Sequence, residues 1–326
     1  MIKPTTDNTI KTVLIIGING GLAQQTAKFL LQQNSQITII GIDSRPIKDS
    51  INDSRVTLKH MKYSRNEFEN LFRNYSFDNV IHLARVTHSS KSAHQIEKRL
   101  EVNLIGTKMI LDLCFRNRVK KIVILSTFHV YGALADNPVF LNENSAMRAS
   151  IAYPELRDVV EMDQICTSWM WEHSHECQTI ILRPCNIIGP NIHNAMTKFL
   201  LNSLAIDPLD YNPMMQFIHE YDMARILAYA LEKIPCGVYN VAPSDHISLQ
   251  QAVKILHGEH SLRLPLSLLG ILNKGLNVVG LGVAPYLIDY LKFSCLISNH
   301  SLSKHLPQQG WHYTSKSAIE SLKTNL

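Results

Sequence analysis

One continuous stretch, residues 12–43, constrains the fold more than any other part of the chain. It begins with an apolar, mostly β-branched run at residues 13–16, which is typical of a strand buried on both faces of a parallel sheet. A glycine-containing turn at residues 17–23, a helical pattern and a second apolar strand at residues 37–42 follow in that order. This order predicts a βαβ unit of an α/β, doubly wound parallel sheet.

The turn has the properties of a dinucleotide site. Gly17 permits a tight turn, Gly20 lets the backbone approach a pyrophosphate, and Ala23 lets the helix pack closely on the sheet. The helix N-terminus offers free N–H groups and a partial positive charge to phosphates. Asp43 ends the second strand, where a carboxylate accepts hydrogen bonds from both ribose hydroxyls and repels a 2′-phosphate. The pattern favours NAD over NADP, and Arg45 weakens that preference; the alternative is an α/β unit whose glycines only form a turn.

Composition excludes several other classes of protein. With 326 residues, 45% of them hydrophobic and 18% charged, the chain is an ordinary globular protein of one large domain or two joined ones. The net charge of +5 comes from scattered basic residues, which suits an anionic small ligand and does not indicate nucleic acid. The six cysteines lie far apart without a C-x-x-C pair, so we expect reduced thiols and a cytoplasmic protein. The histidines are not joined by cysteines or acids at ligand spacing, so no metal site is expected.

The glycine spacing, G-x-x-G-x-x-A, resembles the extended short-chain dehydrogenase/reductase family, which contains NAD-dependent sugar-nucleotide epimerases and dehydratases. The resemblance runs over residues 12–322 and is carried further by these segments: DNVIHLA at 78–84, STFHVYG at 126–132, RPCNIIGP at 183–190 and QFIHEYDMAR at 216–225. It implies a Rossmann-type sheet with a smaller C-terminal substrate-binding cap.

The resemblance also implies a division of the chain. Residues 12–185 and 217–242 would form the NAD-binding domain, and residues 186–216 and 243–326 would form the cap. Residues 1–11 are polar, carry no signal-peptide core and are expected to form a loose leader.

The family's cofactor contacts can be placed on this sequence. The residues that the resemblance assigns to NAD are Gly17, Asn19, Gly20, Gly21, Leu22, Asp43, Leu83, Ala84, Asn103 and Pro184. One of these assignments has an alternative, because Asn103 is equally a polar residue that packs between helices. Lys62 stands where the family has an acid that contacts the adenine, which puts that contact in doubt.

The catalytic residues of the family are matched in part. Thr127 matches the hydroxyl that binds the substrate oxygen, and Tyr153 matches the tyrosine of the Y-x-x-x-K signature. In that signature a spacing of four puts tyrosine and lysine on one helical face, and the lysine lowers the pKa of the tyrosine. Here Arg157 occupies the lysine position, which keeps the charge but changes its shape and its hydrogen-bonding pattern. His129 and Glu161 are possible sources of compensating proton chemistry.

Taken together, the resemblance implies an NAD-dependent epimerase or dehydratase that acts on a sugar nucleotide or a related hydroxyl compound. Candidate substrate-binding residues are Asn186, Lys198 and Arg225, with a turn-capping role as the alternative for Asn186. Two other functions stay open. One is a reductase of a hydrophobic alcohol or ketone, and the other is a catalytically impaired NAD-binding sensor, which Lys62 and Arg157 suggest.

The segment 264–293 is unusually apolar. Asn273, Lys274, Asn277 and Pro285 interrupt it, so we expect no transmembrane helix but a helical part of the cap, or a lid or contact surface. Family members often form homodimers through the two helices expected here at about 99–115 and 153–172, so a homodimer is a further expectation.

Overall fold

A large parallel sheet organises the chain, as the opening stretch predicts. The computed structural model describes residues 12–47, 51–85, 93–202, 206–258, 261–268, 285–307 and 310–325. The strands of this sheet, in chain order, are β1 (Thr12–Ile16), β2 (Thr38–Asp43), β3 (Val56–His60), β4 (Asn79–His82), β5 (Lys121–Leu125), β6 (Gln178–Pro184) and β11 (Gly237–Val241).

The order of the strands across the sheet is β11-β6-β5-β4-β1-β2-β3, and every neighbouring pair is parallel. The chain builds outward from β1 in one direction through β2 and β3, then returns to the other side of β1 with β4. The strand order therefore reverses between β1 and β4, and in such sheets ligands bind at this point, beyond the carboxyl ends of the strands. The predicted fold class, a Rossmann-type doubly wound sheet, is confirmed.

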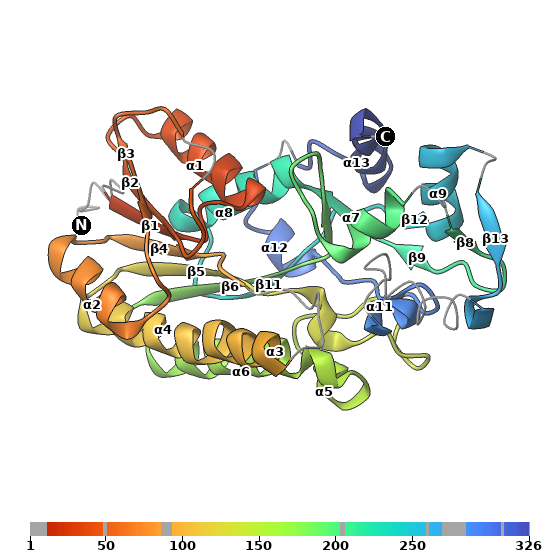
Figure 1. Ribbon diagram of the computed structural model, residues 1–326, viewed down its shortest axis with the longest axis horizontal. Helices are drawn as coiled ribbons and strands as arrows, with labels where there is room; N and C mark the ends of the chain where they lie inside the picture. Colours follow the sequence, from red (N-terminus) through yellow and green to blue (C-terminus); the bar gives the residue numbers. More distant parts are fainter. Residues whose placement is uncertain are drawn as a thin grey trace, which may run out of the picture.

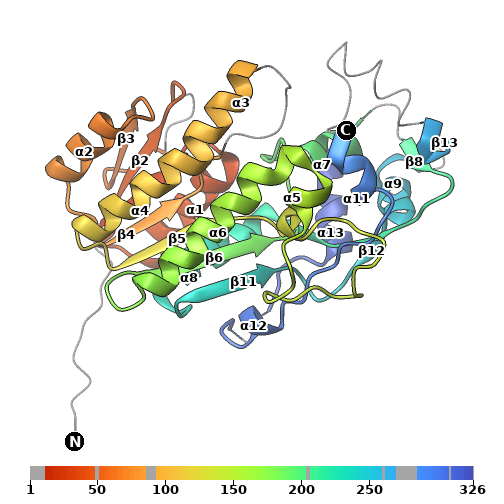
Figure 2. The same cartoon turned by 90° about the horizontal axis from the view of Figure 1, so that it is seen from below.

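Helices cover both faces of the sheet (Figure 1). One face carries α1 and α8, which pack on each other, and the other carries the layer of α2, α3, α4 and α6 (Figure 2). The helices concerned are α1 (Gly21–Gln33), α2 (Arg65–Asn74), α3 (Ala93–Leu100), α4 (Thr107–Arg116), α6 (Arg157–Glu172) and α8 (Glu220–Glu232). Two apolar cores result, because alternate residues of each central strand point to opposite faces, as Leu14 and Ile15 do.

Smaller elements lie beyond the carboxyl ends of the strands (Figure 1). They include three two-stranded sheets, in which β7 pairs with β10, β9 with β12 and β8 with β13. Their bounds, with those of the helices in this region, are α5 (Ala149–Ala152), β7 (Asn186–Ile188), α7 (Ala195–Leu200), β8 (Ile206–Pro208), β9 (Met214–Met215), β10 (Phe217–His219), β12 (Ile247–Ser248), α9 (Leu249–His257), β13 (Leu262–Leu264), α11 (Pro285–Tyr290), α12 (His300–Ser303) and α13 (Ser315–Glu320). The predicted division into a cofactor domain and a cap stays a prediction.

Part of the apolar segment 264–293 is visible. Residues 269–284 lie outside the described residues, while α11 belongs to the described part and packs against the large sheet's carboxyl edge. None of the described helices has the length and apolar character that crossing a membrane requires.

Two buried histidines should make stability depend on pH. Burial lowers the pKa of His82, on β4, from its ordinary 6.5 to about 4, and it does the same for His219. Between pH 6.5 and 4 the unfolded chain therefore binds more protons than the folded one, so the free energy of unfolding falls as the pH falls through this window. Between pH 6.5 and 4 the free energy of unfolding of His82→Gln should therefore fall by up to about 3 kcal/mol less than that of the wild type.

Urea unfolding across the window would measure the effect, with His246→Gln as the control because His246 is exposed. Equal pH profiles for the two variants would contradict the prediction.

Candidate active site

The glycine turn joins β1 to α1 at the carboxyl edge of the sheet. Gly17 has a φ of +94°, and a Cβ there would meet the backbone nitrogen of Ala84 at 3.0 Å. Gly20 precedes the helix with an ordinary φ of −72°, and a Cβ there would touch only the carbonyl oxygen of Gly17 at 3.4 Å. Gly21 packs against Asn191, which would lie 2.5 Å from an added Cβ. Position 17 thus needs glycine because of its positive φ, and position 21 needs it because Asn191 packs so closely. At position 20 the missing side chain leaves open space above the turn.

Asp43, at the end of β2, is linked to this turn. Its carboxylate accepts hydrogen bonds from the backbone N–H of Asn19 at 3.1 Å and from Nε of Arg45 at 3.0 Å. Burial alone raises the pKa of Asp43, but the hydrogen bonds from Arg45 outweigh it, so the pKa lies below its ordinary value. The carboxylate is therefore ionised, and Arg45 covers it with a side chain that is 67% exposed.

These residues fit a dinucleotide. The first turn of α1 contains no acid, so its free N–H groups and partial positive charge face the open space at Gly20. Asp43 offers an ionised acceptor where ribose hydroxyls would lie. Arg45 now donates to both carboxylate oxygens and would have to release one of them to the ribose. Leu83 and Ala84 follow β4 beside Gly17, and Pro184 ends β6. Lys62 is exposed.

Thr127 and Tyr153 both lie near the carboxyl end of β5. Oγ1 of Thr127, which is 6% exposed, lies 2.9 Å from Nδ1 of His129. The hydroxyl of Tyr153 donates to the carbonyl oxygen of Ala133 at 2.8 Å. Burial raises the pKa of Tyr153, and the carboxylate of Asp289 raises it further. In this arrangement Tyr153 is a neutral hydrogen-bond donor.

Arg157 does not share a helical face with Tyr153. Tyr153 follows the short helix α5 in an extended conformation, and a 3-10 turn at residues 154–156 separates it from α6, which begins at Arg157. The spacing of four therefore does not bring the two side chains together. Arg157 is exposed on the outer face of α6 with Glu161, and it forms no hydrogen bond or ion pair with a residue that the structure describes.

A different cation is buried at the start of α6. Arg99 donates through Nη2 to Asp158 at 2.9 Å and to the carbonyl oxygen of Glu155 at 3.1 Å. Asn103, in a π-helical turn at Glu101–Gly106, donates through Nδ2 to Asp158 at 2.7 Å. Asn103 thus fixes the helix that follows Tyr153, and sequence reasoning missed its acceptor Asp158 and the pairing of Asp158 with Arg99. The only sequence signal for this pair is Asp158 itself, an acid directly after Arg157 that lies on the inner face of α6.

The far wall of the site comes from α11. The hydroxyl of Tyr290 donates to the carbonyl oxygen of His129 at 3.0 Å, and its ring lies 6.1 Å from that of Tyr153. The ring of Tyr286 lies 5.5 Å from that of His129. The sequence predicted this segment as a helical part of the cap, or as a lid or contact surface, and did not identify these tyrosines.

The three residues predicted to bind substrate lie in different places. Asn186, on β7, is buried and donates to the carbonyl oxygen of Gln216 at 3.2 Å. Lys198 is exposed on α7. Arg225 pairs with Asp222 and lines a pocket of about 290 Å³ with Gln33, the last residue of α1. The glycine turn lies at the opposite end of that helix, about 20 Å away, so the structure does not bring the three together.

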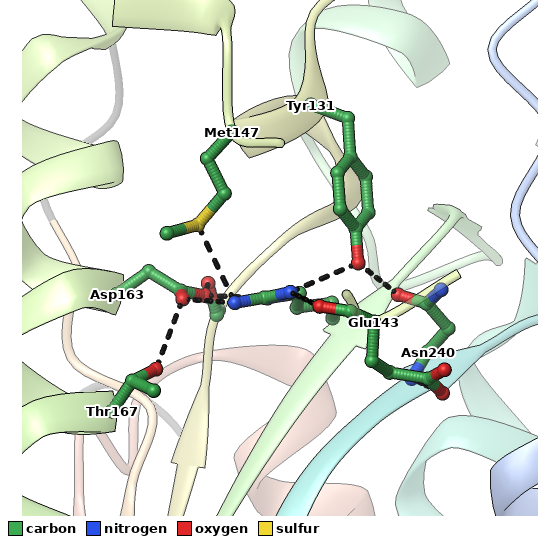
Figure 3. Close-up of polar contacts among 8 residues, drawn as sticks. Tyr131, Glu143, Met147, Asp163, Thr167 and Asn240 are labelled. Carbon is green, nitrogen blue, oxygen red and sulfur yellow. Dashed lines mark hydrogen bonds and ion pairs between the residues drawn. The ribbon is translucent and has the colours of Figure 1, made fainter. Parts of the chain in front are cut away.

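A buried ionic network centres on the pair of Asp163 and Arg183 (Figure 3). Asp163, on α6, accepts hydrogen bonds from the guanidinium of Arg183 and from the hydroxyl of Ser126, the residue before Thr127. Arg183 also donates to the hydroxyl of Tyr131 at 3.0 Å, which donates to Asn240 at 2.8 Å. Figure 3 shows Asp163, Tyr131 and Asn240 around this network, and they come from α6, the 3-10 turn after β5 and β11. The network fixes the strand ends from which Thr127 projects.

Comparison with known proteins places these features in context. A sequence model of the NAD dependent epimerase/dehydratase family matches residues 13–242. An uncharacterised protein of Mycobacterium tuberculosis is 24% identical over 75% of this chain and 65% of its own length. The dTDP-D-glucose 4,6-dehydratase of Dictyostelium discoideum is 28% identical over 77% of this chain and 63% of its own length. This chain therefore spans less than two thirds of the length of these relatives.

Solved structures share the fold. The UDP-glucose 4-epimerase of Thermus thermophilus, in complex with NAD, superposes with a TM-score of 0.72 at 19% identity, over 97% of this chain and 100% of the other. A UDP-glucuronic acid 4-epimerase of Bacillus cereus, in complex with UDP-glucuronic acid and NAD, gives a TM-score of 0.73 at 18% identity, covering 96% and 98% of the two chains.

Proposed function

Because the chain belongs to the NAD dependent epimerase/dehydratase family, we propose that it binds NAD and oxidises a hydroxyl group of a sugar nucleotide or a related compound. The observation that carries the proposal is the joint geometry of the glycine turn and Asp43. The turn has open space at Gly20, and the ionised carboxylate lies beside it, bonded to the N–H of Asn19.

Named residues would hold the cofactor. Gly17 and Gly20 would let the backbone approach the pyrophosphate, which the N-terminus of α1 would attract. Asp43 would accept hydrogen bonds from the adenosine ribose, with Arg45 displaced from part of the carboxylate. NAD, when bound, supplies a hydride acceptor.

The chain's own residues would manage the proton. Thr127 would hold the reacting oxygen of the substrate, as its place after β5 suggests. The substrate's hydroxyl proton would pass to Thr127 Oγ1, while the proton of Thr127 passes to Nδ1 of His129, 2.9 Å away. Burial raises the pKa of Tyr153, so its hydroxyl stays protonated and cannot accept this proton. Tyr153 would then contribute a hydrogen bond from its hydroxyl.

Nucleotide binding is the first test. Thermal unfolding of the purified protein would be followed with NAD and with NADP, and nucleotide released on denaturation would be identified. A ligand at a hundred times its dissociation constant stabilises a protein by about 2.7 kcal/mol, so binding is readily visible. We expect NAD to stabilise more than NADP. No response to either nucleotide, in a folded protein that releases none, would overturn the proposal.

Turnover is the second test. The NAD-bound protein would be offered UDP-glucose, UDP-glucuronic acid, dTDP-glucose and an apolar secondary alcohol, with products separated by chromatography. A sugar-nucleotide product supports the proposal. Reaction of the apolar alcohol alone would instead identify a reductase of hydrophobic compounds, which the aromatic wall formed by Tyr286 and Tyr290 would suit.

A second candidate function is NAD binding without turnover, as in a sensor. The observation that favours it is the site around Tyr153, where the pKa is raised and Arg157 points to solvent. Tyr153→Phe and His129→Gln separate the two functions. Loss of turnover in either variant, with NAD binding retained, supports the enzyme. Equal NAD binding with no turnover in wild type and variants supports the sensor.

We also propose that two chains associate through the helical layer of α3, α4 and α6. Several large apolar side chains are exposed on this layer and on the adjoining α5: Leu100, Ile105, Phe115, Ile151 and Trp171. Ile105 and Trp171 are 66% and 74% exposed, which is costly unless another surface covers them.

The double variant Ile105→Lys/Trp171→Lys should therefore convert a dimer to a monomer in light scattering. Val139→Lys is the matched control, because Val139 is 74% exposed but lies in the loop after β5. A wild-type protein that is monomeric at high concentration would contradict the proposal.

A further inference from the structure

Arg85 is a cation at the point where the strand order of the sheet reverses. It follows β4 by three residues, directly after Ala84, whose backbone approaches Gly17. Its Nη1 donates to the carbonyl oxygen of Ser126, just beyond β5, at 3.4 Å. The guanidinium therefore bridges the carboxyl ends of β4 and β5, one strand away from the glycine turn that follows β1. In a doubly wound sheet this is the crevice in which ligands bind.

The guanidinium has no carboxylate partner among the described residues. Among the described residues, its one hydrogen bond is the long one to Ser126, and it forms no ion pair with any of them. Asp158 lies close enough to interact with its charge, but both oxygens of Asp158 already accept hydrogen bonds from Arg99, and one accepts from Asn103 as well. Burial lowers the pKa of Arg85, which Tyr286 and Asp158 only partly oppose.

Arg85 is half-buried, and a guanidinium that has lost part of its water without gaining an anion is energetically costly. An arginine in this state is a donor set ready for an oxyanion, because its planar fork matches phosphate and carboxylate groups. The other charges nearby do not fill this role. Arg157 is exposed on the outer face of α6, and Arg99 is neutralised by Asp158.

We propose that Arg85 is an oxyanion-binding residue at the junction of the cofactor and substrate sites. This inference rests on the proposed function and deepens it, by assigning to Arg85 the recognition of an anionic group on a bound nucleotide. Two sources share that chemistry: the pyrophosphate of the cofactor, and a phosphate or carboxylate of the substrate. Arg85 acts in binding, and its guanidinium donates without exchanging a proton.

Binding measurements on charge variants test the proposal. Arg85→Met keeps the length and removes the charge, Arg85→Lys keeps the charge and removes the fork, and Arg157→Met is the matched control on the solvent side. Calorimetric titrations with NAD, inorganic pyrophosphate, UDP-glucose and UDP-glucuronic acid would use each protein. A hydrogen bond to a charged group contributes about 1.5–3 kcal/mol, so its loss weakens binding about tenfold to a hundredfold.

We expect Arg85→Met to lose about tenfold or more in affinity for one class of ligand, Arg85→Lys to lose less, and Arg157→Met to match the wild type. Weaker binding of NAD and pyrophosphate identifies the cofactor as the source. Weaker binding of UDP-glucuronic acid, with NAD and UDP-glucose unchanged, identifies a substrate carboxylate. Weaker binding of both UDP-sugars, with NAD unchanged, identifies the substrate phosphates.

Unchanged or tighter binding of every probe by Arg85→Met would overturn the inference, because the side chain would then only fill the crevice. A lower stability of ligand-free Arg85→Met would also overturn it, since the guanidinium would then be a structural group. A wild type that binds pyrophosphate or a UDP-sugar but not NAD defeats the proposed cofactor function. In that case the effect of Arg85→Met on those ligands still decides the role of Arg85.

Discussion

Replacing Asp163 by alanine should destabilise the protein by about 3–5 kcal/mol, the typical effect of removing one partner of a buried ion pair. Asp163 is fully buried and Arg183 is 3% exposed, so the variant leaves a guanidinium with no carboxylate and no access to water. The hydroxyl of Ser126 loses its acceptor in the same step. Urea unfolding measures the change in free energy.

Two further variants make this prediction specific. Asp136→Ala removes an exposed partner of Arg148 and should leave stability unchanged, because surface ion pairs contribute little. Asp163→Ala combined with Arg183→Met removes both charges and should recover part of the lost stability. Equal destabilisation by Asp163→Ala and Asp136→Ala would show that the buried network contributes no more to stability than an exposed ion pair does.

The second large effect is on cofactor binding without an effect on folding. Gly20→Ala should weaken NAD binding by about tenfold to a hundredfold, because a Cβ would project into the space above the turn where the backbone meets the pyrophosphate. Its backbone angles suit alanine, and only the carbonyl of Gly17 lies within reach of the new atom, at 3.4 Å. The free energy of unfolding should change by no more than about 1 kcal/mol, the usual difference between glycine and alanine at a helix N-cap.

Gly17→Ala provides the contrast. Its φ of +94° is a conformation that alanine rarely adopts, and the new Cβ would meet the backbone of Ala84. This variant should lose both stability and NAD binding. Calorimetry with NAD and urea unfolding on both variants separate the two effects, and retained NAD affinity in Gly20→Ala would mean that the pyrophosphate does not lie over the turn.

The fold could be predicted because its signals are local. The stretch 12–43 contains a strand, a turn, a helix and a strand in continuous sequence, and each part is buried as its composition predicts. The positive φ of Gly17 and the bonding of Asp43 to the turn follow from the same stretch. Local propensity, apolar pattern and turn chemistry agree here, which is when sequence reasoning succeeds.

The region around Tyr153 could be predicted less well, because the pattern assumes that Tyr153 and Arg157 belong to one helix and they do not. A tyrosine and a basic residue four apart face the same way only when both belong to one helix. Here Pro154 begins a 3-10 turn after Tyr153, and α6 starts only at Arg157, four residues after the tyrosine. Arg157 then turns outward, and Asp158 takes the inner position. A pattern of residue types does not show this change of phase.

Long-range contacts were the other obstacle. Tyr290 reaches the carbonyl of His129 across 161 residues of sequence. The sequence of the apolar segment 264–293 does not indicate which of its side chains lie near Thr127, His129 or Tyr153. Arg85 was missed for the same reason, since its position becomes informative only when β4 and β5 are seen side by side.

The position of α11 has a consequence for the order in which the protein is completed during synthesis. All seven strands of the large sheet have left the ribosome once residue 241 has emerged, so the sheet can form while translation continues. The wall that Tyr286 and Tyr290 place against His129 arrives about fifty residues later. A nascent chain can therefore complete the sheet and its glycine turn before His129 is covered, and a stop codon between the two would leave the carboxyl end of β5 open at His129.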